Sequence, residues 1–228
     1  MTALVLQARL DSSRLNCKAL LPLGDRPLVF RVMSALAFLP CEEKILACPE
    51  DSVSAFAPLA EEAGFILVSG PKEDVLARYC LAIRMSGADR VIRATADNPF
   101  VFVDAAVAIE SEASALGADY AGYFGLPYGA GVESVASEAL LRAEREAQAP
   151  DEREHVCPYL YKHPELFRLH RPFAPRRWQG PECRITVDTR EDYDRAKSLY
   201  ERLSSLPLEK RNYGENVLSA YGSLWKGE

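Results

Sequence analysis

Short apolar runs alternate with helix-type segments through the first half of the chain, and this alternation restricts the possible folds more than any other feature. Four runs have the length and composition of buried strands, at residues 3–6, 44–48, 65–68 and 90–94. Helices are expected after them at residues 27–40, 51–63, 74–85 and 104–116. Strands that alternate with helices form right-handed βαβ units, so the sequence predicts an α/β fold with a mostly parallel central sheet.

The second half of the chain is less regular. Strands are expected at residues 118–122, 166–173 and 184–187, and helices at 137–147, 151–162 (broken by Pro158), 190–203 and 213–225. Four glycines between residues 122 and 131 predict a loop there. Thr189 and Asp192 have the spacing of a capping box, which fixes the start of the helix at residue 190. We find no repeat and no linker, which favours one domain over residues 1–228.

Charge and composition exclude several classes of protein. The net charge is −6, which argues against a nucleic-acid partner, because such proteins usually present a broad basic face. The first apolar run has no basic region ahead of it, and no stretch approaches the roughly 18 apolar residues of a membrane helix. We therefore expect a cytoplasmic protein without a membrane partner. The six cysteines are scattered without a CxxC pair, which predicts free thiols rather than disulfides or zinc ligands.

Three cations follow the first predicted strand: Arg9, Arg14 and Lys18. Ligands of open α/β sheets bind beyond the carboxyl ends of the strands, so these side chains suggest a polyphosphate site, helped by backbone amides of the turn 11–13. The phosphate-loop motif GxxxxGK[ST] and the dinucleotide motif GxGxxG are both absent after this strand. A solvated surface loop explains the charges equally well at this stage.

Two acids, Asp97 and Asp188, each follow a predicted strand. If both strands lie beside the first, these carboxylates face the cationic loop across one crevice. Carboxylates and phosphates together provide the hard oxygen ligands that Mg²⁺ prefers. The alternative is that each acid only caps the helix that follows it.

Seven segments, in the same order along the chain, resemble motifs of the acylneuraminate cytidylyltransferase family, in its spore coat polysaccharide biosynthesis branch. That branch is close to the enzymes that activate 3-deoxy-manno-octulosonate with CTP. The segments are residues 6–18, 21–28, 73–79, 93–99, 126–133, 154–159 and 186–193. The resemblance spans nearly the whole chain and is therefore more specific than any single motif.

The resemblance implies a Rossmann-like, three-layer nucleotidyltransferase. A sugar-acid hydroxyl would attack the α-phosphorus of CTP in the presence of Mg²⁺, and pyrophosphate would leave. Such a reaction needs positioning and charge neutralisation rather than a protein nucleophile. The resemblance also implies a homodimer that pairs through an arm at residues 120–175, with CTP and a small sugar acid as substrates.

The family roles transfer to individual residues of this sequence. The implied catalytic residues are Arg9, Lys18, Asp97 and Asp188, and the two aspartates among them are the implied Mg²⁺ ligands. The implied nucleotide-binding residues are Gln7, Ala8, Arg9, Arg14, Lys18, Gly70, Asp74, Val75, Arg78 and Asp97. The implied acceptor-binding residues are Arg93, Tyr128, Glu133 and His155, although a solvated loop acid and a helix-start histidine remain alternatives for the last two.

Two other functions stay open on the sequence. A glycosyltransferase of related fold would need a metal-binding DxD motif, but Asp192 and Asp194 fall inside a predicted helix, where residues two apart do not face each other. A nucleotide-binding homologue without activity is suggested by Asn16 and Cys17, which stand where the branch usually has Pro-Gly. Ala130 and Gly131 also depart from the branch, which leaves the acceptor open.

Overall fold

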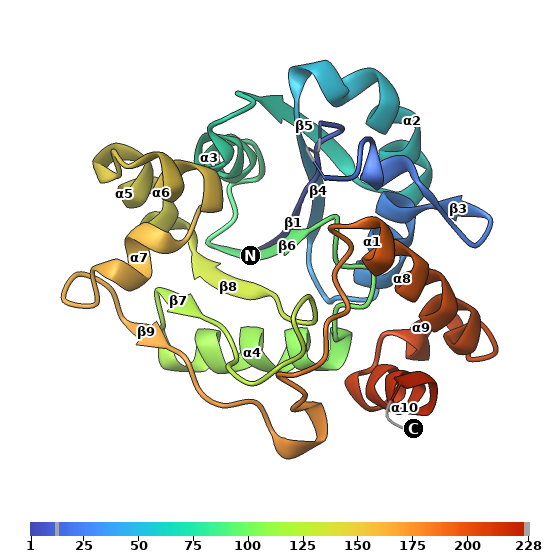
Figure 1. Ribbon diagram of the computed structural model, residues 1–228. Coiled ribbons are helices and arrows are strands. Elements are labelled where there is room, and N and C mark those ends of the chain that lie inside the picture. The colour runs from blue at the N-terminus through green and yellow to red at the C-terminus, as the bar shows by residue number, and fades with distance from the viewer. Residues whose placement is uncertain (12–13, 226–228) are drawn as a thin grey trace.

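The computed structural model describes residues 1–11 and 14–225. Within them, seven strands form one sheet in the order β5-β4-β1-β6-β8-β7-β9 (Figure 1). They are β1 (Thr2–Gln7), β4 (Glu43–Pro49), β5 (Ile66–Gly70), β6 (Arg90–Thr95), β7 (Tyr120–Ala121), β8 (Glu133–Ala136) and β9 (Leu169–His170). Strand β8 is antiparallel to both of its neighbours, whereas the other described pairings in this sheet are parallel. The mostly parallel sheet is confirmed.

The predicted helices are also present. The longer ones are α1 (Leu28–Leu36), α2 (Val53–Ala63), α3 (Val75–Ser86), α4 (Val103–Leu116), α5 (Ser137–Glu146), α8 (Arg190–Leu203) and α10 (Gly214–Trp225). Pro158 separates two short helices, α6 (Pro150–His155) and α7 (Pro158–Lys162), and a further short helix is α9 (Leu208–Arg211). Three single-turn 3-10 helices, η1 (Lys18–Leu20), η2 (Glu50–Ser52) and η3 (Arg176–Trp178), and the hairpin of β2 (Pro22–Leu23) and β3 (Arg26–Pro27) complete the described elements.

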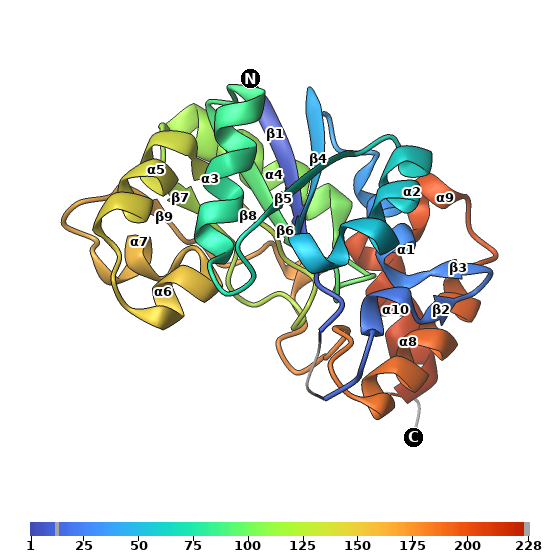
Figure 2. The same ribbon diagram turned by 90° about the horizontal axis from the view of Figure 1, so that it is seen from above.

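Helices cover both faces of the sheet, because successive side chains of a strand point to opposite sides. In β1, Leu4 and Leu6 pack into a core with α1, α2, α4, α8 and α10, whereas Ala3 and Val5 pack into a second core with α3, α5 and α7. Figure 2 shows α3, α5, α6 and α7 on one side of β1 and β6, and α1, α2 and α8 on the other. The three-layer α/β fold is therefore confirmed. None of the helices in the described residues combines the length and apolarity needed to cross a membrane.

One expected strand is absent, and one strand was not expected. Residues 184–187 form no strand: the backbone there makes a bridge at Arg184 and hydrogen bonds from Ile185 N to Tyr128 O (2.9 Å) and from Val187 N to Asp97 O (2.8 Å). Its apolar pattern reflects burial between loops rather than pairing within the sheet. Strand β8 was not expected, because it directly follows the glycine-rich loop and its four residues alternate too briefly to be recognised.

Candidate active site

A cavity of about 380 Å³ opens beyond the carboxyl ends of β1 and β6. These strands are neighbours, but the chain first passes from β1 to β4 and β5 on the other side before it returns to β6. Such a reversal of strand order leaves a crevice at the sheet edge where α/β proteins bind ligands. The fold therefore places the cavity where the sequence predicts it.

Most of the predicted site residues line this cavity. They are Gln7, Ala8, Arg9, Arg14, Lys18, Val75, Arg78, Arg93, Asp97, Tyr128, His155 and Asp188. Three predicted residues, Gly70, Asp74 and Glu133, do not. Asp74 instead caps α3 by accepting a hydrogen bond from Ala77 N (2.9 Å) and forms an ion pair with Arg153, while a Cβ on Gly70 would approach Leu81 Cδ1 to 2.8 Å. Sequence reasoning missed Thr95, Asn98, Gly129, Glu154 and Thr186, which lie next to predicted residues along the chain.

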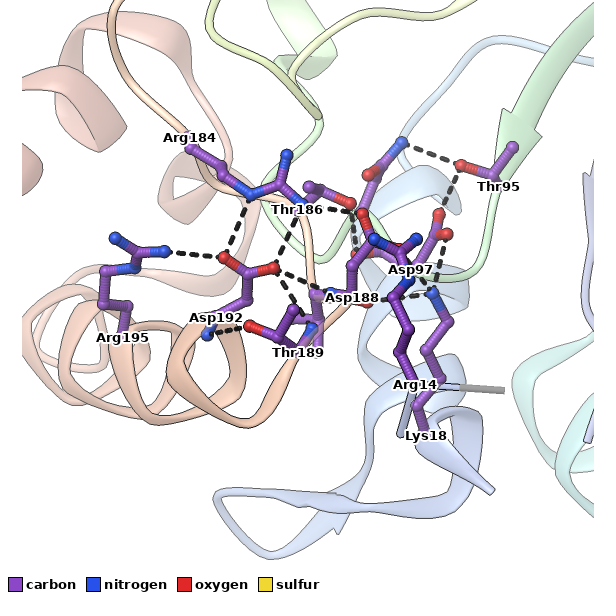
Figure 3. Close-up of polar contacts among 12 residues, drawn as sticks. Arg14, Lys18, Thr95, Asp97, Arg184, Thr186, Asp188, Thr189, Asp192 and Arg195 are labelled. Atoms are coloured by element: carbon purple, nitrogen blue, oxygen red, sulfur yellow. Dashed lines mark hydrogen bonds and ion pairs between the residues drawn. The ribbon is translucent and has the colours of Figure 1, made fainter. Parts of the chain in front are cut away.

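Lys18 joins the two predicted metal ligands. Its ammonium donates hydrogen bonds to Asp97 Oδ2 (3.0 Å), to Asp188 Oδ1 (2.9 Å) and to the carbonyl of Val187 (2.9 Å) (Figure 3). The Lys18 and Asp188 side chains are only 15% and 11% exposed. Asp97 and Asp188 therefore form an acidic pair inside the cavity, and neither carboxylate caps a helix in the described part of the chain.

The pKa of the Asp188 carboxyl reflects its cationic surroundings. Burial raises this pKa, but the hydrogen bond and charge of Lys18, the charge of Arg14 and the hydrogen bond from Arg184 together lower it by more. Arg14 Nη2 lies 3.3 Å from Asp188 Oδ1 and Arg184 Nη2 lies 2.7 Å from Oδ2. The net pKa is below the usual range, so Asp188 is a carboxylate at neutral pH.

The other oxygen of each carboxylate is held by a protein donor. Thr95 Oγ1 donates to Asp97 Oδ1 (2.7 Å), and Arg184 donates to Asp188 Oδ2. Arg184 also bonds both oxygens of Asp192 (3.0 Å each), a buried residue of the capping box that starts α8. The predicted capping box is thus confirmed, and it lies directly behind Asp188.

Arg9 and Arg14 extend the cationic side of the cavity. Arg14 is 64% exposed, and Arg9, which is 47% exposed, lies 3.8 Å from Glu154 in a loose ion pair. Exposed cations that line a cavity and are weakly paired are available to an anion. The predicted contribution of backbone amides concerns a turn whose residues 12 and 13 lie outside the described part of the chain.

Arg78 has a different role from the other cations. It is almost fully buried, and its Nη1 donates to the carbonyls of Pro71 (2.5 Å) and Lys72 (2.8 Å). Burial lowers the pKa of its guanidinium. The side chain therefore fixes the loop after β5 against α3 at the border of the cavity.

A second cavity of about 270 Å³ shares Arg93, Thr95 and Asn98 with the first. Glu133 lies in it, forms an ion pair with Arg93 and accepts a hydrogen bond from the Tyr120 hydroxyl (2.7 Å). Burial lowers the pKa of Arg93, but the charge of Glu133 raises it by more, so the guanidinium stays charged. Of the four residues predicted to bind the acceptor, Arg93 and Glu133 line this cavity, whereas Tyr128 and His155 line only the first.

The residues that line the second cavity without having been predicted include three aromatic side chains and one cation: Tyr120, Tyr123, Phe124 and Arg171. The Arg171 guanidinium lies 4.4 Å from the centre of the Phe124 ring, and among the described residues it has no hydrogen-bond or ion-pair partner. With Arg93 and Glu133 neutralising each other, Arg171 gives this cavity a net positive charge. In the sequence, the second cavity is indicated only by the aromatic residues and glycines around residue 122.

Two backbone positions shape the rims of the site. Gly129 has φ +99°, and a Cβ there would approach Thr186 N to 2.7 Å. Cys17 has φ 51°, a left-handed conformation that residues other than glycine rarely adopt. Cys17 therefore holds a conformation that glycine would adopt without steric cost.

Comparisons with known proteins bear on the family of this chain. A family model described as cytidylyltransferase matches residues 3–218. Spore coat polysaccharide biosynthesis protein SpsF of Bacillus subtilis (strain 168) is 31% identical over 210 residues, which cover 89% of this chain and 88% of SpsF.

Solved structures share the fold. A cytidylyltransferase from Leptospira borgpetersenii superposes with a TM-score of 0.86 at 22% identity, covering 99% of this chain and 94% of its own. A CMP:2-keto-3-deoxy-manno-octonic acid synthetase complexed with CTP superposes with a TM-score of 0.67 at 15% identity, covering 90% of this chain and 99% of its own. The nucleotidyltransferase fold is confirmed by these superpositions. By the family match and the SpsF identity, the chain belongs to the cytidylyltransferase family.

Proposed function

We propose that this protein transfers CMP from CTP to a hydroxyl of a 3-deoxy-ulosonic sugar acid, with Mg²⁺ as cofactor and pyrophosphate as the leaving group, in surface polysaccharide biosynthesis. The observation that carries the proposal is the convergence of Asp97 and Asp188 on one ammonium group, in a cavity that Arg9 and Arg14 also line. The relatives named above support the choice of nucleotide and of pathway.

The acidic pair fits a divalent cation. Asp97 and Asp188 already share one positive charge, that of Lys18, at 3.0 Å and 2.9 Å. When Lys18 turns to the phosphates, two carboxylates remain for a metal, and Mg²⁺ is commonly bound by one or two carboxylates together with substrate phosphates. Bound there, Mg²⁺ would neutralise charge on the α-phosphate and the leaving pyrophosphate.

The cations of this chain would bind the rest of the triphosphate. Lys18 and Arg9 contact phosphate oxygens, and Arg14 offers a forked guanidinium beside them. These contacts orient the α-phosphorus for in-line attack and stabilise charge that develops on the leaving group. No covalent intermediate with the protein is required.

The acceptor would occupy the second cavity. Arg93 lines both cavities and Glu133 lines the second, whereas Tyr128 and His155 line the first. Arg171 supplies a net positive charge suited to a carboxylate, and the ring of Tyr123 offers an apolar face to the sugar. A hydroxylated monocarboxylic acid matches these features.

Pyrophosphate release tests the proposal. The full chain is incubated with CTP, Mg²⁺ and a panel of 2-keto-3-deoxy sugar acids, with Asp97→Asn as the test variant. Asp194→Asn removes a half-exposed carboxylate from α8 and serves as the matched control. We expect the control to match the wild type and Asp97→Asn to lose most turnover. Silence across the panel with all four nucleoside triphosphates would refute the function, and full activity of Asp97→Asn would refute the metal assignment alone.

A homodimer through residues 120–175, in the cytoplasm, is part of the same proposal. Phe124, Tyr128 and Phe173 are 43%, 61% and 77% exposed, which is unusual for large apolar or aromatic side chains gathered on one arm. Light scattering tests the dimer, and a mass near 25.3 kDa, that of one chain, would contradict it.

The glycosyltransferase alternative loses support at its metal motif. Asp192 is only 2% exposed and is saturated by Arg184, Arg195 and backbone amides, so it offers no oxygen to a metal. Hydrolysis of a nucleotide sugar without pyrophosphate release would nevertheless favour that alternative over ours.

A further inference from the structure

Asp97 and Asp188 share one arrangement of hydrogen bonds. In each carboxylate, one oxygen accepts a hydrogen bond from a protein side chain and the other faces the Lys18 ammonium (Figure 3). For Asp97 the protein donor is Thr95, and for Asp188 it is Arg184. Each carboxylate thus presents a single oxygen to the cation between them.

The donor on the Asp97 side has a fixed direction. Asn98 Nδ2 donates to Thr95 Oγ1 (2.8 Å), and Thr95 Oγ1 lies 2.7 Å from Asp97 Oδ1. A hydroxyl has one hydrogen, and because the Asp97 carboxylate can only accept, that hydrogen must point at Asp97 Oδ1. The chain from Asn98 through Thr95 therefore keeps this oxygen engaged and the carboxylate from rotating.

The donor on the Asp188 side is held just as firmly. Arg184 is anchored by two bonds of 3.0 Å to Asp192, and the same carboxylate accepts from the backbone N–H of Asp188 (3.1 Å). Asp192 also accepts from Arg195 (2.7 Å) and from Thr189 N (3.2 Å), so its own position is set by α8. Both the backbone and the outer oxygen of Asp188 are fixed by this cluster.

We propose that Thr95 and Arg184 are positioning residues that limit Asp97 and Asp188 to one cation-facing oxygen each, and that this limit selects Mg²⁺ over Ca²⁺. Mg²⁺ demands near-ideal octahedral geometry, which single oxygens from two carboxylates permit, whereas Ca²⁺ takes more ligands and accepts bidentate carboxylates. An outer oxygen that a fixed donor already holds disfavours the reorientation that bidentate binding requires. The inference rests on the proposed function, because it takes the two carboxylates as ligands of a cation that binds with CTP.

Calorimetric titration of the full chain with CTP, in excess Mg²⁺ or excess Ca²⁺ and without acceptor, tests this selection. The measured quantity is the ratio of the two dissociation constants. Thr95→Val removes the hydroxyl at constant shape, and Arg184→Gln removes the second clamp. We expect each to shift the ratio toward Ca²⁺ by about tenfold, a typical effect of losing a residue that orients a metal ligand. Loss of the Arg184 charge acts on both cations alike, which is why the ratio is diagnostic.

Matched variants separate positioning from general damage. Thr95→Ser keeps the hydroxyl, and Arg190→Ala removes a cation of α8 that pairs with Asp194 rather than with Asp188 or Asp192. We expect both to keep the wild-type ratio. Because Thr95 lies on β6 and Arg184 precedes α8, each variant tests the inference if the other fails to fold.

Several results would overturn the inference. Equal weakening with both cations, an unchanged ratio, or a wild type without preference for Mg²⁺ would overturn it alone. CTP binding that needs no divalent cation would overturn both the inference and the proposed metal, whereas absence of CTP binding would overturn the proposed function as a whole.

Discussion

Replacing Cys17 by glycine should stabilise the protein. The residue has φ 51° at the start of η1, directly before Lys18. A left-handed conformation costs a residue with a Cβ about 1–2 kcal/mol. Glycine avoids that cost but loses about 0.5–1 kcal/mol more conformational entropy on folding. The difference predicts a gain of about 0.5–1 kcal/mol, or roughly 1–4 °C in Tm for a chain of this size.

Chemical denaturation of the wild type, Cys17→Gly and Cys17→Ala measures this difference. The alanine variant keeps the Cβ and loses only a weak contact of the thiol with Asn16 Oδ1 at 3.5 Å, so its stability should stay close to that of the wild type. Because glycine adopts the existing geometry, Lys18 keeps its place and the KM for CTP should not change. If the glycine variant is no more stable than the alanine variant, the left-handed conformation of Cys17 carries no strain and the prediction is refuted.

Three further outcomes follow from the site. Gly129→Ala should destabilise the protein by about 2–4 kcal/mol, because its Cβ would approach Thr186 N to 2.7 Å at φ +99°. Thermal unfolding measures this loss, and a loss below about 0.5 kcal/mol, which is typical of surface substitutions, would contradict it. Arg171→Ala should raise the KM for a sugar-acid acceptor roughly tenfold without changing the KM for CTP, because a charge-assisted hydrogen bond to the acceptor is lost. Arg177→Ala, which lies outside both cavities, should change neither KM. An unchanged acceptor KM in Arg171→Ala would show that Arg171 does not bind the acceptor. Burial raises the pKa of Cys80 to about 12, so a thiol reagent at pH 8 should leave it unmodified in the folded protein while labelling the half-buried Cys17, as mass spectrometry of peptides can show; rapid labelling of Cys80 would contradict its burial.

The regular part of the fold could be read from the sequence because its signals are local. The strand 3–6 and the capping box of Thr189 and Asp192 each depend on residues close together in the chain, and both are present in the structure. Arg9, Lys18 and Asp97 could be placed at one crevice because parallel strands end at the same edge of a sheet.

The remaining features depend on contacts between distant segments. Residues 184–187 have the composition of a strand, but their hydrogen bonds go to Tyr128 and Asp97, which no local pattern reveals. Arg171 lines the second cavity only because β9 pairs with β7. Arg184 forms an ion pair with Asp188, four residues further along the chain. In the sequence, this spacing looks no different from that of an ordinary surface ion pair.

The bond between Lys18 and Asp188 joins residues 170 positions apart in the chain. All strands of the described seven-stranded sheet, and the helices from α1 to α7, precede that aspartate in the sequence. A chain synthesised up to β9 therefore already contains the whole sheet. Native contacts of such long separation form late, because the entropy of closing a large loop must first be offset. In refolding, we therefore expect the sheet to acquire its backbone protection before the acidic pair assembles, and nucleotide binding to be the last property regained.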